Sequence, residues 1–408
     1  MNIVIANVLD FNPQIGGLER VSCNLAVEFG RMGHIVYFVA MRESPYTPYS
    51  QNQCKPVVEQ MMLPNPLIAN CEENFFCFTN YLVEKKIDIL INQAAETAEF
   101  SNLCMAVKTK TKIKLLSVLH FDPARNIKLY YSDPSLLFYR SWVVRQIFML
   151  LKMVYFLRPK RYKRDLSKLY HQLYVESDAV VLLSDHFKPT YKKIAKLHDI
   201  SKLKSIPNSL TFSVSEETGL KEKQILWIGR FQIMQKRPER LVKVWSYLEA
   251  KYPDWHVLFL GDGIYRPKVE QYVRRLGLKN IRFGGFADPE EAYRKSSIIC
   301  MTSTYEGFGL VLTEAMQFGV VPMAFSSFES IDDIIKEGVT GYKIKPYDLK
   351  QYARQLELLM TDENRRSQMA QNARKHVTEK FNVERITQQW ITLFEQVCCS
   401  TCSELPIL

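Results

Sequence analysis

The chain has 408 residues, of which 47% are hydrophobic and 24% are charged, which excludes a disordered or collagen-like protein. At about 150 residues per domain, this length predicts two or three domains. The formal net charge of +11 lies mostly in the front half: residues 1–206 carry 27 Lys and Arg against 18 Asp and Glu, and the remainder carries 27 against 25. This excess indicates a negatively charged partner or surface near the front half.

Short apolar runs alternate with helical patterns from the first residue onward. This alternation predicts parallel strands that helices cover on both faces. The predicted strands of the front half are 3–8, 35–40, 87–92, 114–119 and 179–183. A helix is predicted over 18–31. The amino terminus has the pattern of a buried strand rather than a signal peptide, which favours a cytoplasmic protein.

Residues 141–157 interrupt this alternation of strands and helices with an almost continuous apolar run. Six Lys or Arg residues follow between 158 and 168, and Asp165 is the only acidic residue among them. A membrane-spanning helix needs about 20 predominantly apolar residues, and this run is shorter and contains charges. One interpretation is an interfacial helix that binds an anionic membrane surface through residues 141–168. The other is a helical insertion that packs on the front domain.

The strand and helix alternation starts again after Pro207. Strands are predicted over 224–229, 255–261, 281–284, 297–301 and 320–324, helices over 239–251, 266–276, 289–295 and 310–318, and several further helices over 349–397. We therefore predict an α/β chain with a front domain over 1–205 and a back domain over 206–380. The front domain would contain the helical insertion at about 135–170, and a terminal helix and tail would occupy 381–408.

The nine cysteines are too few and too scattered for a disulfide scaffold, so reduced thiols are expected. Cys399 and Cys402 near the end of the chain suggest a metal site. Structural zinc takes four ligands, however, and no second Cys or His pair has a suitable spacing. A C-terminal tail is the favoured interpretation.

Two loops that follow predicted strands carry residues suited to a phosphate. Gly16 and Gly17 separate the first strand from the first helix, where glycines allow a ligand to approach and the helix N-terminus attracts an anion. A turn without a ligand explains this pair equally well. Arg230 and Lys236 lie in the loop after strand 224–229. Ligands of open α/β sheets bind at the carboxyl ends of strands, so these cations suit a diphosphate unless they are solvated surface charges.

A third stretch, 301–316, combines a predicted strand, a glycine loop and a helix. Gly307 and Gly309 can expose backbone N–H groups at the start of the helix, which creates an anion site without a metal. Glu306 and Glu314 are eight positions apart and can face the same crevice. Carboxylates bind hydroxyl groups better than phosphates, so the combination predicts a nucleotide sugar as the ligand.

Glu306 and Glu314, with Gly-Phe-Gly-Leu between them, resemble the E-x7-E motif of the retaining glycosyltransferases of family 4. Arg230 and Lys236 resemble the diphosphate-binding pair of that family, and Gly16-Gly17 resembles its front-domain glycine loop. The resemblance implies a GT-B fold, in which two Rossmann-like domains face a central cleft. It also implies that the C-terminal helix crosses back to the first domain.

The resemblance also implies roles for individual residues. Glu314 would hold the donor ribose hydroxyls, and Glu306 would contact the transferred sugar. The amides of Phe308, Gly309 and Leu310 would hold phosphate and sugar, and the loop Gly284-Gly285-Phe286 is similar to one that binds the base through backbone groups. His120 follows a predicted strand and resembles a polar residue near the transferred sugar; a structural histidine is the alternative.

Two positions depart from the family pattern. Arg237 follows Lys236 where the family usually has glycine, and Asn208-Ser209 stands where it usually has Asn-Gly. These differences concern local loop shape and leave the two glutamates unchanged.

The predicted function is a retaining hexosyltransferase that moves a sugar from a nucleotide sugar, with a UDP-sugar favoured, to a saccharide or lipid-linked saccharide acceptor. No Asp-x-Asp triplet occurs in the chain, so neither a metal nor another cofactor is expected. The predicted context is capsule, O-antigen, lipopolysaccharide or exopolysaccharide biosynthesis at the inner face of the cytoplasmic membrane, without a nucleic-acid partner. The alternatives are a nucleotide-sugar 2-epimerase of the same architecture and a non-catalytic saccharide-binding or nucleic-acid-binding protein.

Overall fold

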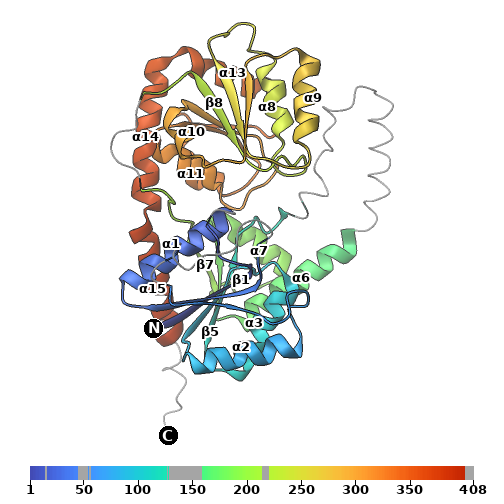
Figure 1. The fold of residues 1–408 in the computed structure, drawn as a ribbon, viewed down its shortest axis with the longest axis vertical. Helices are drawn as coiled ribbons and strands as arrows, with labels where there is room; N and C mark the ends of the chain where they lie inside the picture. Colours follow the sequence, from blue (N-terminus) through green and yellow to red (C-terminus); the bar gives the residue numbers. More distant parts are fainter. Residues whose placement is uncertain are drawn as a thin grey trace. The chain divides into compact units, whose positions relative to one another are not determined.

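The computed structural model describes residues 1–13, 16–44, 54, 57–125, 127, 159–213 and 220–399. The chain divides into two compact units (Figure 1). Unit 1 comprises Met1–Pro123, Arg164–Thr211 and Phe381–Leu408, and unit 2 comprises Ala124–Lys163 and Phe212–Lys380. Most of the predicted insertion at 135–170, the apolar part of the predicted membrane segment and Cys402 lie outside the described residues.

Unit 1 contains a parallel sheet in the order β3-β2-β1-β4-β5-β6-β7. Its strands are β1 (Asn2–Leu9), β2 (Ile35–Arg42), β3 (Gln60–Met62), β4 (Ile89–Asn92), β5 (Lys114–Leu119), β6 (Ala179–Leu182) and β7 (Leu203–Ser205). The five predicted strands of the front half are confirmed as β1, β2, β4, β5 and β6, which are mostly apolar and mostly buried. The short β3 and β7 at the sheet edges were not predicted.

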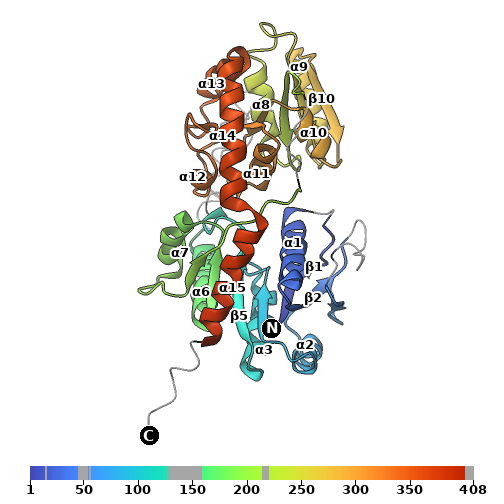
Figure 2. The ribbon, with the colours of Figure 1, turned by 90° about the vertical axis from the view of Figure 1, so that its left-hand side faces the viewer.

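Helices flank this sheet and include the last helix of the chain (Figure 2). They are α1 (Gly17–Arg31), α2 (Glu72–Glu84), α3 (Ala98–Lys110), α6 (Pro159–Glu176), the 3₁₀ helix η3 (Asp185–Phe187), α7 (Lys188–Ala195) and α15 (Val383–Cys399). In α15, the buried Trp390 and Phe394 lie on one face, and Phe394 packs on Phe29 of α1 with ring centroids 5.3 Å apart. The expectation that the final helix returns to the first domain is therefore confirmed.

Cys23 and Cys54 differ from the expected reduced thiols. Cys23 lies on the buried face of α1, with its Cα 5.4 Å from that of Cys54, and the two sulfur atoms form a disulfide. This Cα separation is within the usual range for a disulfide. Two residues 31 positions apart cannot be paired from sequence spacing alone, because the pairing depends on the three-dimensional fold.

Unit 2 contains a second parallel sheet in the order β10-β9-β8-β11-β12-β13. Its strands are β8 (Gln224–Ile228), β9 (His256–Leu260), β10 (Ile281–Gly285), β11 (Ile298–Met301), β12 (Val321–Phe325) and β13 (Tyr342–Ile344). Its helices are α8 (Pro238–Trp245), α9 (Arg266–Leu276), α10 (Glu290–Lys295), α11 (Leu310–Gln317), α12 (Ile331–Ile334), α13 (Leu349–Thr361) and α14 (Glu363–Phe381).

The predicted helix over 239–251 is shorter in the structure. After α8, backbone bonds with a three-residue spacing, such as Leu248 N to Trp245 O at 2.8 Å and Lys251 N to Leu248 O at 2.9 Å, are mixed with four-residue bonds such as Glu249 N to Trp245 O at 3.0 Å. This tighter turn still buries Leu248 in the same core as Trp245. The apolar spacing therefore extended the prediction beyond the true end of the helix.

Both sheets reverse their strand order at one point. In unit 1, β2 and β3 lie on one side of β1, and β4 pairs with the other side of β1. In unit 2, β9 and β10 lie on one side of β8, and β11 pairs with its other side. In open α/β sheets, ligands bind at the carboxyl ends of the strands at this reversal. The loops that follow β8 and β11 are thus neighbours at the expected ligand site of unit 2.

Candidate functional site

Hydrogen bonds join the loops after β8 and β11. The Thr304 amide donates to the Gln235 carbonyl at 2.7 Å, and the Thr302 hydroxyl donates to the Arg237 carbonyl at 2.9 Å. The indole N–H of Trp227, on β8, donates to the same hydroxyl at 3.1 Å. These bonds hold the segment that contains Lys236 against the segment that contains Glu306.

Lys236 and Glu306 form a largely buried ion pair. The Lys236 ammonium donates to Glu306 Oε1 at 2.7 Å, and the two side chains are 20% and 8% exposed. The Ser303 hydroxyl donates to the same oxygen at 2.6 Å, and Gln235 Nε2 lies 3.4 Å from Oε2. A charged residue is rarely buried unless it is paired, so the loops are built to hold this carboxylate in one orientation.

Arg230 lies two residues after the end of β8, and its side chain is exposed. Gly229 precedes it, and a Cβ built at Gly229 would lie 3.3 Å from Lys236 Cδ. The glycine therefore leaves room for the lysine side chain to pass along the strand end. The structure thus places both predicted cations at the carboxyl end of β8.

The glycine loop before α11 ends in a left-handed turn. Gly309 has a φ of 97°, a left-handed conformation that favours glycine, and it precedes the first residue of α11. The buried Ser330 hydroxyl donates to the carbonyls of Gly307 at 3.1 Å and Phe308 at 3.3 Å. The first amides of an α-helix have no partner within the helix, so the start of α11 offers N–H donors to an anion.

Glu314 lies on α11 and is almost completely buried. Its Oε2 accepts a hydrogen bond from the Tyr293 hydroxyl at 2.8 Å. Tyr293, Ser303 and Gln235 contact the two motif glutamates and were not predicted as site residues. Of these three residues, only Gln235 could have been suspected from the sequence, because it directly precedes the predicted site residue Lys236.

Phe286 follows β10 and is exposed. Gly285 before it has a φ of 72°, and its carbonyl accepts a bond from the Gly261 amide at 2.6 Å. In the sheet order, β10 is separated from β8 by β9. The loop predicted to bind the base thus lies at the same carboxyl edge of the sheet as the loops predicted to bind phosphate.

The remaining predicted site residues belong to unit 1. Gly16 precedes α1 with an extended backbone, and a Cβ there would lie 2.7 Å from Glu19 Oε2, so the absence of a side chain allows that carboxylate to fold back. His120 follows β5 and is buried, and its Nε2 contacts Gln93 Oε1 at the end of β4. Burial lowers the pKa of His120 to about 3, so its imidazole is neutral at physiological pH.

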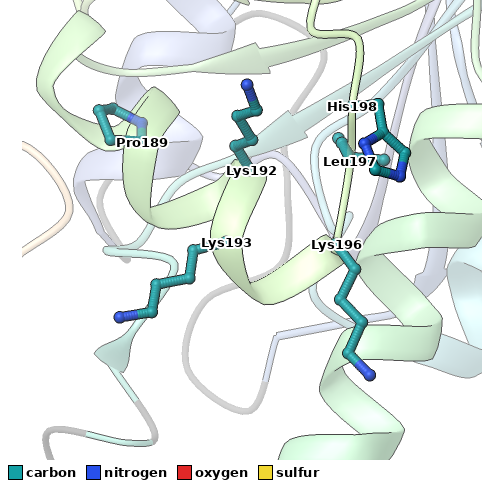
Figure 3. A pocket seen from close by; sticks show the side chains of 6 residues that line it. All are labelled: Pro189, Lys192, Lys193, Lys196, Leu197 and His198. Carbon is teal, nitrogen blue, oxygen red and sulfur yellow. The ribbon is translucent and has the colours of Figure 1, made fainter.

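A shallow surface hollow in unit 1 is lined by Pro189, Lys192, Lys193, Lys196, Leu197 and His198 (Figure 3). The three lysines point in different directions from α7, so their charges do not converge on one point.

In the described part of the chain, no group of three or more His, Cys, Asp or Glu side chains could hold a metal ion. Among the described helices, none is long and apolar enough to cross a membrane.

Comparison with known proteins finds sequence similarity to one family of enzymes. Residues 211–376 match the family model described as "Glycosyl transferases group 1". A Campylobacter jejuni relative, named GalNAc-alpha-(1->4)-GalNAc-alpha-(1->3)-diNAcBac-PP-undecaprenol alpha-1,4-N-acetyl-D-galactosaminyltransferase, is 26% identical over 81% of this chain and 80% of its own length. The amylovoran biosynthesis glycosyltransferase AmsD of Erwinia amylovora is 26% identical over 52% of this chain and 61% of its own length.

Solved structures show the fold. HepE from Anabaena, solved in complex with UDP, is similar with a TM-score of 0.73 and 16% identity, over 97% of this chain and 100% of that chain. The likeness confirms the GT-B fold that the sequence resemblance implied.

Proposed function

We propose that this chain, which has a GT-B fold, is a glycosyltransferase that transfers a sugar from a nucleotide sugar with retention of configuration and without a metal ion. The proposed donor is a UDP-sugar, and the proposed acceptor is a lipid-linked saccharide in the assembly of a surface polysaccharide. The observation that supports this most is the Lys236–Glu306 pair beside the α11 amides, at the strand-order reversal of unit 2.

The charged groups of the candidate site in unit 2 each have a proposed partner on the donor. Arg230, Lys236 and the α11 amides would bind the diphosphate, which is doubly anionic or more, while Glu306 and Glu314 would accept hydrogen bonds from sugar and ribose hydroxyls. Lys236 already holds Glu306 at 2.7 Å. A diphosphate bound to Lys236 would therefore lie beside the carboxylate that orients the transferred sugar. In unit 1, His120 would bind the sugar as a neutral hydrogen-bonding group.

The proposed reaction breaks the bond between the anomeric carbon and the phosphate oxygen. The electron pair of this bond passes to the diphosphate, whose growing negative charge is stabilised by the preorganised cations and amides. The acceptor hydroxyl forms the new bond on the same face of the sugar, which retains the configuration. Its proton passes to a phosphate oxygen of the leaving group.

Two observations support a lipid-linked acceptor at a membrane surface. The name of the Campylobacter jejuni relative specifies an undecaprenol-linked acceptor. The described part of the basic segment, on α6, exposes Lys163, Arg164 and Lys168 while Leu166 and Tyr170 are buried. We propose that this face of α6 meets anionic headgroups at the inner face of the cytoplasmic membrane.

The test incubates the protein with UDP-sugars and GDP-sugars, with undecaprenyl-diphosphate-linked saccharides as acceptors, and with EDTA in a parallel series. Proton NMR of the product should show the same anomeric configuration as the donor, and EDTA should leave the rate unchanged. An inverted product or loss of the rate with EDTA would contradict the proposed chemistry. Formation of an epimer without an acceptor would instead identify a 2-epimerase.

A further inference from the structure

Glu314, the second carboxylate of the motif, has a buried hydrogen-bond donor of its own. The Tyr293 hydroxyl, on α10, donates to Glu314 Oε2, on α11, at 2.8 Å, and both side chains are buried. Hydrogen bonds to an ionised acceptor are stronger than those between neutral groups. A glutamate side chain can rotate about several bonds, and this contact selects one of its orientations.

The Tyr293 ring is itself held in place by aromatic packing. It stacks on Phe318 with centroids 5.6 Å apart and meets the edge of Phe212 at 5.9 Å. Gln317 Nε2 donates to the Phe212 carbonyl at 2.6 Å, and Lys221 Nζ donates to the Tyr293 carbonyl at 2.9 Å. Both the ring and the backbone of Tyr293 are therefore fixed, so its hydroxyl is presented to Glu314 from a constant position.

We propose that Tyr293 is a positioning residue that orients Glu314 for binding the two ribose hydroxyls of the nucleotide. The inference rests on the proposed role of Glu314. A carboxylate has about four acceptor positions, so the bond to Tyr293 still leaves Glu314 able to accept further bonds. Because the hydroxyl of Tyr293 restricts the carboxylate before the nucleotide binds, less conformational freedom is lost on binding.

The test measures how strongly the protein prefers ribose hydroxyls. The affinities of UDP and 2′,3′-dideoxy-UDP, and of GDP and 2′,3′-dideoxy-GDP, are compared by calorimetry for the wild type, Tyr293→Phe and Glu314→Gln. Tyr293→Phe should weaken binding of the ribose nucleotide by about two- to ten-fold, as expected for one hydrogen bond, and leave the dideoxy nucleotide unchanged. The ratio of the two affinities should therefore fall.

A matched control separates this role from a general effect of losing a buried hydroxyl. Tyr352 is also fully buried in unit 2, and its hydroxyl donates to the Met323 carbonyl at 2.8 Å rather than to a motif glutamate. Tyr352→Phe should lower the melting temperature as Tyr293→Phe does but keep the affinity ratio of the wild type. In the double variant Tyr293→Phe/Glu314→Gln, the affinity ratio should be no lower than in Glu314→Gln alone, because Tyr293 acts through Glu314.

The outcomes distinguish the two proposals. A wild-type affinity ratio in Glu314→Gln, or no binding of either nucleoside diphosphate, would contradict the proposed function. A lowered ratio in Glu314→Gln together with a wild-type ratio in Tyr293→Phe would overturn the positioning role and leave the proposed function intact. Equal reductions in Tyr293→Phe and Tyr352→Phe would also overturn it, because the effect would then be structural.

Discussion

Arg237 occupies a backbone conformation that favours glycine. Its φ is 54°, in the left-handed region, which costs a residue with a Cβ roughly 1–2 kcal/mol. Its guanidinium lies 2.8 Å from the carboxylate of Glu239, and both side chains are buried. The two groups are not aligned for a linear hydrogen bond, so the attraction is chiefly coulombic. By contrast, Ser209 has no positive φ and needs no glycine.

Arg237→Gly is expected to destabilise the protein although glycine suits this backbone conformation. Removing one partner of a buried ion pair costs about 3–5 kcal/mol, which exceeds the strain of roughly 1–2 kcal/mol that glycine relieves, so a net loss of about 1–4 kcal/mol is predicted. Urea unfolding measures it. The double variant Arg237→Gly/Glu239→Gln should recover part of this loss, and a single variant as stable as the wild type would refute the role of the pair.

His120 predicts a specific dependence of stability on pH. Its folded pKa of about 3 lies below the ordinary value of 6.5, so between these values the unfolded state binds more protons. The contribution of His120 to the free energy of unfolding is therefore fully present above pH 6.5. It decreases by about 1.4 kcal/mol per pH unit as the pH falls from 6.5 toward 3. In His120→Gln, the free energy of unfolding should fall less steeply between pH 6.5 and 5 than in the wild type.

The control for this prediction is His186→Gln, because the His186 side chain is exposed. This variant should keep the wild-type slope. Parallel curves for the wild type and His120→Gln would show that His120 is protonated equally in both states.

At the scale of single elements, the start of α11 combines a left-handed glycine turn with the proposed phosphate site. Gly309→Ala should cost roughly 1–2 kcal/mol of stability, because alanine disfavours a φ of 97°. It should also weaken binding of the donor, since a shift of this turn moves the first amides of α11. Urea unfolding and nucleotide-sugar titration measure the two effects.

Gly277 provides the matched glycine for this experiment. It ends α9 in the same unit with a φ of 70°, and a Cβ there would meet no atom within 4 Å. Gly277→Ala should therefore lose similar stability and retain donor binding. Equal losses of donor binding in both variants would argue against the phosphate role of the α11 N-terminus.

The sequence predicted those elements whose signal lies within the element itself. Central strands such as β1 and β12 are buried on both faces and therefore consist of continuous apolar residues. The edge strands β3, β7 and β13 have three residues each, too few for a pattern. Contacts such as Tyr293 with Glu314, Gln93 with His120 and Cys23 with Cys54 join residues more than 20 positions apart, so they depend on the fold.

At the scale of the whole molecule, the charge excess of the front half includes two exposed basic surfaces in the described residues. The α6 surface consists of Lys163, Arg164 and Lys168, and the α7 surface consists of Lys192, Lys193 and Lys196. The α6 surface directly follows the apolar residues 141–157 in the sequence, whereas the α7 surface has no such neighbour in the chain. An apolar segment beside basic residues is the combination that binds a membrane surface.

Reversing the charge of the α6 surface should therefore release the protein from membranes, and the α7 surface supplies a control of equal charge. Each basic residue near an anionic surface contributes about 1 kcal/mol, so replacing all three with Glu should weaken binding to phosphatidylserine vesicles by at least roughly 100-fold. The corresponding triple variant of α7 changes the net charge equally but should sediment with the vesicles much as the wild type does. Equal release of both variants would mean that net charge alone drives binding, and recovery of the wild type in the supernatant with and without vesicles would refute the membrane proposal.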